Sequence, residues 1–155
     1  MDWYLFVRLV HILGAAILFG TGIGIAWFML FADRTHDARV IAATARIVVG
    51  ADMIFTATAA LLQPVTGSVL VYWAGHSFLD LWVWLSIVLY LVIGACWLPV
   101  VWLQIRMRNL AEAAIAMNAP LGEEYHRYMR IWFLLGWPAF TSIIAIFGLM
   151  VFKPV

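Results

Sequence analysis

The pattern of apolar and polar positions divides the chain into four long apolar stretches separated by three polar connections. The stretches cover residues 3–32, 40–62, 81–105 and 131–152. A helix of about 20 apolar residues is long enough to cross the hydrocarbon core of a bilayer. Each stretch meets this requirement, and a helix satisfies its own backbone hydrogen bonds where water is absent. The pattern therefore predicts an all-α integral membrane four-helix bundle.

The three connections differ in character. Residues 33–39 are short and polar, which makes the first two helices antiparallel neighbours. Residues 63–80 open with Pro64 and then carry aromatic side chains, which favour the headgroup zone of a membrane. We expect an interfacial or re-entrant segment there. Residues 106–124 predict an extension of the third helix that breaks before Pro120.

Composition supports this class of protein. Apolar residues make up 66% of the 155 residues and charged residues only 11%, whereas soluble domains average about 45–50% and 25%. The length suits a single transmembrane domain over residues 1–155 with the lipid bilayer as its surroundings. The formal net charge of +1 argues against binding to nucleic acid. A single cysteine, Cys96, excludes an internal disulfide.

The distribution of cations predicts an orientation. Two residues, Arg8 and Lys153, belong to one side of the membrane, and seven arginines flank the first and third connections on the other: Arg34, Arg39, Arg46, Arg106, Arg108, Arg127 and Arg130. Cytoplasmic loops carry the excess of positive charge. We therefore expect both termini on the periplasmic side of a bacterial inner membrane, with His11 and His76 in its outer part.

His11 is the strongest functional lead. It lies in an apolar stretch in which Arg8 is the other ionisable residue before Asp33. An ionisable side chain inside a membrane is costly, so it usually has a partner, a ligand or a function. One interpretation is structural, with His11 bonded to a carbonyl group or to a network that includes Arg8.

The other interpretation of His11 is that it ligates a haem b iron. The second axial ligand would be His76 or His11 of a second subunit, and Arg8 would neutralise a propionate. Small residues of the first helix would admit a flat ring, or a second helix in a homodimer. These residues are Gly14, Ala15, Gly20, Gly22 and Gly24.

Asp52 is a second ionisable residue in an apolar stretch. Arg46 lies six residues earlier and points about 120° away on a helical wheel, so we expect a partner from another helix. Candidates are Arg106, Arg130 or a tyrosine. An ion pair that fixes the orientation of the helices is the favoured interpretation, and a proton relay or a cation site is the alternative.

Four segments carry a resemblance to a known family: LVHILGAAILFGTGIGIAWFM, ARIVVGADMIFTATAALLQPVTG, ACWLPVVWLQIRMRNL and LGWPAF. Together they resemble the bacterial integral membrane family called domain of unknown function 2269, which implies an inner-membrane location and four spans. A looser likeness connects the chain to HemJ-type protoporphyrinogen oxidases and CopD-type copper proteins. The HemJ-type likeness implies haem b binding at His11. That family also uses a lysine in a later helix, whereas Lys153, at the far end, is the single lysine here.

Two functions follow from these observations. The first is a haem b-binding redox protein of the inner membrane, with His11 as an axial ligand. The second is a cofactor-free accessory or transport-related membrane subunit, whose first helix packs on itself or on a partner. A soluble-type hydrolase is excluded because no cluster of nucleophile, base and carboxylate is visible.

Overall fold

The computed structural model describes residues 2–154, which form helices and no strand. Four helices are long and apolar enough to cross a membrane, as the sequence predicts. The second of these is one continuous rod in which a π-helical turn, η1, joins α2 to α3. The elements in chain order are α1 (Trp3–Arg34), α2 (Ala38–Ala51), η1 (Asp52–Thr56), α3 (Ala57–Trp73), α4 (Leu81–Ala116) and α5 (Glu123–Phe152).

The ends of the helices follow local side-chain chemistry. Asp2 and Asp37 cap α1 and α2, because their side chains accept hydrogen bonds from the backbone N–H groups of Tyr4 and Arg39. As predicted, α4 continues beyond residue 105, and it ends at Ala116, ahead of Pro120. The fourth span begins earlier than expected, at Glu123 rather than residue 131.

The expectation of an interfacial or re-entrant segment over residues 63–80 was wrong for its first half, because α3 continues through Pro64 to Trp73. A proline inside a helix removes the hydrogen bond to the carbonyl four residues earlier, here that of Ala60. In this structure the Tyr90 hydroxyl of α4 donates to the Ala60 carbonyl oxygen. The missing bond is thus replaced from a neighbouring helix.

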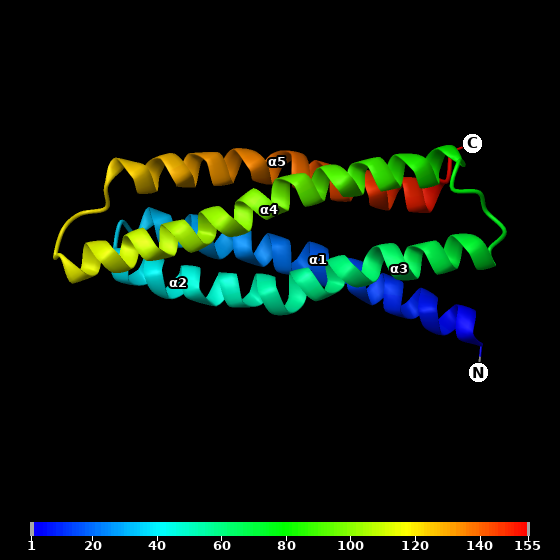
Figure 1. Ribbon diagram of the computed structural model, residues 1–155, viewed down its shortest axis with the longest axis horizontal. Coiled ribbons are helices and arrows are strands. Elements are labelled where there is room, and N and C mark those ends of the chain that lie inside the picture. Colours follow the sequence, from blue (N-terminus) through cyan, green and yellow to red (C-terminus); the bar gives the residue numbers. More distant parts are fainter. Residues whose placement is uncertain (1, 155) are drawn as a thin grey trace.

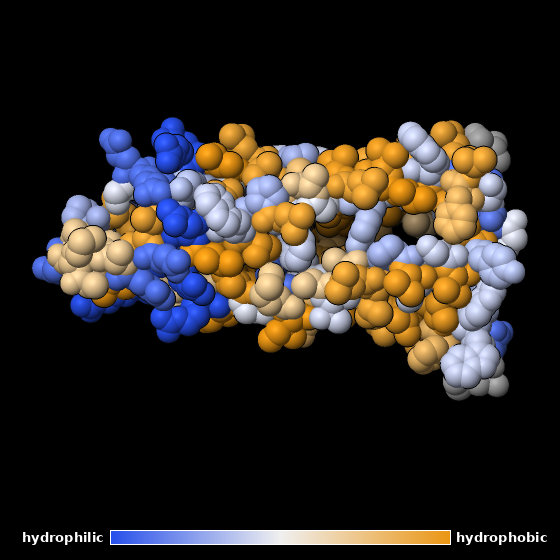
Figure 2. Space-filling model, in the orientation of Figure 1, coloured by the Kyte–Doolittle hydropathy of each residue, from blue (hydrophilic) through white to orange (hydrophobic). Residues whose placement is uncertain are grey.

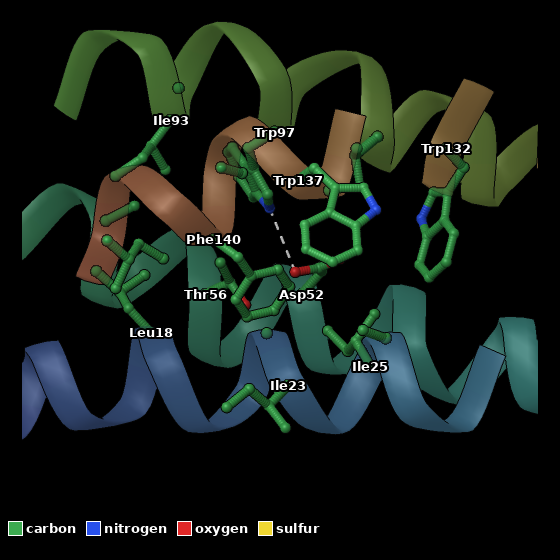
Figure 3. Close-up of a pocket in the computed structure, with 18 of the residues that line it drawn as sticks. Leu18, Ile23, Ile25, Asp52, Thr56, Ile93, Trp97, Trp132, Trp137 and Phe140 are labelled. Atoms are coloured by element: carbon green, nitrogen blue, oxygen red, sulfur yellow. Dashed lines mark hydrogen bonds between the residues drawn. The ribbon is translucent and has the colours of Figure 1, made fainter. Parts of the chain in front are cut away.

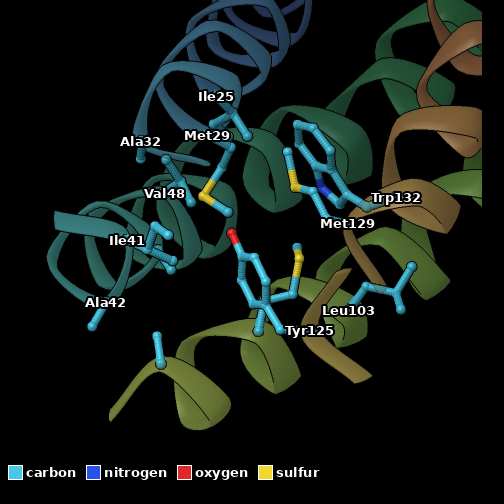
Figure 4. Packing of buried hydrophobic residues seen from close by; sticks show 13 residues of the cluster. Ile25, Met29, Ala32, Ile41, Ala42, Val48, Leu103, Tyr125, Met129 and Trp132 are labelled. Carbon is cyan, nitrogen blue, oxygen red and sulfur yellow. The ribbon is translucent and has the colours of Figure 1, made fainter. Parts of the chain in front are cut away.

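The helices pack unevenly along the bundle. α4 packs along α5, α1 packs on α2 and α3, and α2 packs on α4 (Figure 1). The main hydrophobic core lies at the end that holds the α1–α2 and α4–α5 connections, and it includes Met29, Ile41, Met107, Tyr125 and Trp132 (Figure 4). A small second cluster joins Val71 of α3 to Trp82 and Val83 of α4 at the other end. This smaller cluster, with Leu149 of α5 packed against it, holds α3, α4 and α5 together at the end where α1 diverges from them (Figure 1).

The surface shows how the bundle meets its surroundings. Hydrophobic side chains cover most of the length of the bundle, and hydrophilic ones gather at the end that holds the main core (Figure 2). α1 begins and α5 ends at the opposite end (Figure 1). This distribution is that of a protein embedded in a lipid bilayer.

Candidate functional site

A cavity of about 520 Å³ lies between the main core and the smaller cluster. α1, the rod of η1 and α3, α4 and α5 all contribute to its lining, which is predominantly aliphatic and aromatic (Figure 3). On one face of the molecule a hollow is visible between α3 and α4 (Figure 2). The most exposed residues of the lining belong to α1 and α5, with Trp27 60% and Trp137 61% exposed, so the cavity opens toward the bilayer between these two helices.

Asp52 is the acidic group of this cavity. It begins the π-helical turn, its side chain is 3% exposed, and the indole Nε1–H of Trp97 donates to its Oδ1 at 3.3 Å (Figure 3). π-helical turns recur at functional sites, because the extra residue changes the direction in which side chains point. Here the turn carries Asp52 and Thr56 into the cavity lining.

Three further buried polar groups belong to the cavity lining. They are the Thr56 hydroxyl, both amide atoms of Gln104 and the indole Nε1 of Trp132. Within residues 2–154 none of these atoms has a hydrogen-bond partner, and Gln104 is fully buried. Buried polar groups are nearly always bonded in folded proteins. The cavity therefore combines an apolar wall with buried polar atoms that lie behind its surface and lack a partner.

The predicted ion pair of Asp52 was wrong. Its partner is Trp97, and no ion pair of Asp52 occurs in the described part of the chain. Arg106 instead bonds Glu124 at 3.4 Å, and Arg130 bonds the backbone carbonyl of His126. These arginines are exposed near the hydrophilic end, so their guanidinium groups remain with water rather than entering the apolar interior.

His11 belongs to α1, and its side chain faces α3. Its Nδ1 is 2.8 Å from Oγ1 of Thr66, whose hydroxyl is also 2.8 Å from the Leu62 carbonyl oxygen. A hydroxyl has one hydrogen, so when Thr66 donates to Leu62 it accepts from the His11 Nδ1–H. This arrangement leaves Nε2 as the nitrogen with a free lone pair. Arg8 is exposed, and the expected network with it is replaced by Thr66.

Glycines allow α1 and α3 to approach each other at His11. The Gln63 Nε2–H donates to the His11 carbonyl oxygen at 2.8 Å. A Cβ atom at Gly14 would lie 2.5 Å from that nitrogen, and one at Gly67 would lie 3.3 Å from Cε1 of His11. Small residues at these two positions are therefore required by the packing of polar side chains between the helices.

The structure gives His76 partners other than His11. His76 follows the end of α3, where its Nδ1 is 3.2 Å from Oδ2 of Asp80 and its ring packs edge-on against Trp82. Among the described residues that line the cavity there is no histidine, cysteine or methionine. These residues do not fit a haem held in the cavity by ligands of this chain.

Comparison with known proteins gives the family of the chain. The family described as Predicted integral membrane protein (DUF2269) matches residues 5–154. This chain belongs to that family. No curated protein and no solved structure matches the DUF2269 chain.

Sequence reasoning found Asp52 of this DUF2269 protein but missed the groups around it. Trp97 and Gln104 lie in an apolar stretch without charge, where tryptophan is common and a glutamine is easily overlooked. A polar amide within an apolar span is itself costly. Gln104 was therefore the available signal for a functional cavity.

Proposed function

We propose that this DUF2269 protein binds a membrane-soluble amphiphile in its cavity, as a cofactor-free accessory or transport-related subunit. The observation that carries the proposal is an apolar cavity of about 520 Å³ bordered by Gln104, whose buried amide has no partner in residues 2–154. Ligand sites are typically apolar cavities of about 300–1,000 Å³ with a few polar groups that fix the orientation of the ligand.

The arrangement of the lining favours a ligand with a polar head and an apolar body. Asp52, Thr56 and Gln104 supply donors and acceptors on the side of η1 and α4, and the remaining lining supplies aliphatic and aromatic surface. A molecule dissolved in the bilayer would enter from the side, between α1 and α5, without crossing water. Such a ligand would bond to the amide and hydroxyl groups once these side chains rotate toward the cavity.

Filling the cavity is expected to abolish this binding. A Cβ atom at Gly94 of the lining meets nothing within 4 Å, so Gly94→Leu should fold and place its side chain in the cavity. We expect the affinity for the neutral amphiphile pyrenylbutanol to fall at least about tenfold, which corresponds to about 1.4 kcal/mol. Energy transfer from tryptophan to pyrene in maltoside micelles measures this affinity.

The matched control is Gly148→Leu, because Gly148 also has open space around it but does not line the cavity. Its affinity for pyrenylbutanol should equal that of the wild type. Equal affinity of all three proteins, or no saturable binding to the wild type, would contradict the proposal.

Haem b ligation by His11 is the second candidate. It is supported by the Nδ1–Thr66 hydrogen bond, since metal-binding histidines usually donate their other ring N–H to a nearby acceptor. The second ligand would then come from His11 of a second subunit. If this candidate is correct, the purified protein in its reduced state shows a haem α-band in the visible spectrum. The His11→Ala variant lacks that band. A featureless spectrum after expression with ample haem would contradict it.

A homodimer through α1 is supported by the small residues that the bundle leaves uncovered. Gly14 faces Gln63 and Gly22 faces Phe140 of α5, whereas Gly20 is exposed and has nothing within 4 Å of its Cβ position. Ala16, Gly20 and Gly24 lie four residues apart along α1, the spacing that lets two membrane helices approach closely. Light scattering of the detergent-solubilised protein would distinguish a dimer from a monomer by mass.

The bacterial inner membrane, with both termini in the periplasm, is supported by the seven arginines that flank the first and third connections. A reporter enzyme active only in the periplasm, fused after α5, should then be active. A reporter active only in the cytoplasm should be active when it is inserted into the connection before α5.

A further inference from the structure

We propose that the amphiphile is a hydrophobic cation and that the Asp52 carboxylate is its counter-ion, an inference that rests on the proposed binding function. The charges of the cavity point to this class of ligand. Of the described lining residues, Asp52 is the single acidic one, and none is lysine, arginine or histidine. Tyr90 is the other titratable group of the lining, and its hydroxyl is already bonded to Ala60.

Asp52 has neutral polar neighbours but no cationic partner in the described chain. Removing an ionised group from water costs several kcal/mol unless nearby charges and hydrogen bonds compensate. The Trp97 indole N–H lies 3.3 Å from Oδ1 of Asp52, the Thr56 hydroxyl and the Gln104 amide are its other polar neighbours, and the described chain offers it no cation within ion-pair distance. A proton or a positively charged molecule must therefore accompany this carboxylate, and the cavity beside it has room for a molecule.

The aromatic side chains near Asp52 favour an organic cation. Trp97 of α4 and Trp137 and Phe140 of α5 line the same cavity as the carboxylate, with Trp137 at its exposed edge (Figure 3). The faces of indole and phenyl rings attract ammonium groups, and aromatic cages are a common way to bind quaternary ammonium ligands. The same rings would also contact the apolar part of the molecule.

A bare metal ion fits the site less well. Among residues 2–154 there is no group of three or more histidine, cysteine, aspartate or glutamate side chains that could hold a metal ion. Hard cations require about six oxygen ligands, and soft ones prefer sulfur or imidazole. One carboxylate surrounded by aromatic rings supplies neither set, whereas it satisfies an ammonium group on an apolar body.

Two pyrene probes that differ in their head group test the inference. Pyrenylbutyl-trimethylammonium carries a positive charge, and pyrenylbutanol is neutral; both are titrated against the full-length wild type and the near-isosteric Asp52→Asn. We expect the wild type to bind the cation at least about tenfold more tightly than the alcohol. In Asp52→Asn the affinity for the cation should fall at least about tenfold, with the affinity for the alcohol unchanged.

The outcomes separate the two proposals. The wild type could bind both probes with equal affinity, and Gly94→Leu could lower both affinities. This result would overturn the counter-ion assignment and leave the binding function intact. Absence of saturable binding by either probe would overturn the binding function itself. Should Asp52→Asn fail to fold, a third probe, anionic pyrenylbutanoate, is titrated against the wild type instead. The wild type should bind this anion at least about tenfold more weakly than the alcohol, and equal binding would overturn the inference.

Discussion

Gln104→Leu is expected to stabilise the protein and to weaken ligand binding at the same time. Gln104 is 0% exposed, and neither Nε2 nor Oε1 has a partner in the described chain. An unsatisfied buried polar group costs about 1–3 kcal/mol, so an apolar side chain of similar size should recover about that amount. The free energy of unfolding, from denaturant titration in mixed micelles, measures the gain.

Gln63→Leu is the matched control for this prediction. Gln63 lines the same cavity, but its Nε2–H donates to the His11 carbonyl oxygen at 2.8 Å. Removing a satisfied donor should lower stability by about 0.5–1.5 kcal/mol. If both leucine variants lost stability to the same extent, the Gln104 amide would be bonded in the native protein, and the basis of the binding proposal would fail.

A Gln104→Leu variant that is more stable but binds the ligand more weakly would show that Gln104 serves binding at the expense of stability. Natural proteins tolerate a destabilising group where function requires it. The affinity of Gln104→Leu for pyrenylbutanol is therefore measured alongside its stability, and we expect it to be lower than that of the wild type. A stabilised variant with unchanged affinity would remove Gln104 from the binding site.

Tyr125→Ala is expected to cause the largest loss of stability. The Tyr125 side chain is 1% exposed in the main core, and its hydroxyl donates to Oδ1 of Asp33 at 3.0 Å. It thereby connects α5 to the end of α1. Truncating a large buried aromatic side chain costs about 3–5 kcal/mol, through lost packing and the space it leaves. The same denaturant titration measures this loss.

Tyr125→Phe separates packing from hydrogen bonding at this position. It keeps the ring and removes only the bond to Asp33, so we expect a loss of about 1.5–3 kcal/mol, the range for hydrogen bonds to charged groups. If the phenylalanine variant were as unstable as the alanine variant, the packing of the ring would contribute nothing. The core described at this end of the bundle would then be wrong.

The sequence predicted the four spans because their length and apolar character are local properties of the chain. It did not predict the continuation of α3 through Pro64, since the compensating Tyr90 hydroxyl comes from another helix. The partner of Asp52 was missed for a related reason. Matching opposite charges pointed to arginines, but the site lies in the apolar interior, where an indole 45 residues away along the chain is the donor.

His11 shows the same limit in a different form. Its position in an apolar span marked it as a residue with a partner, and the structure supplies Thr66 from α3. The expectation that His76 converges with it came from membrane sidedness alone, which fixes depth but not position within the bundle. The side chains of His76 and Asp80 bond to each other instead.

The π-helical turn also sets the register between two parts of the same rod. A π-helical turn amounts to one extra residue in an α-helix, and each residue rotates an α-helix by about 100°. Asp52 lies at the start of the turn, whereas Gln63 and Thr66 follow it and face His11 of α1. Without that extra residue, the side chains after the turn would swing away from α1 while Asp52 kept its direction. A single inserted position thus allows one helix to present polar groups to the cavity and to α1 at once.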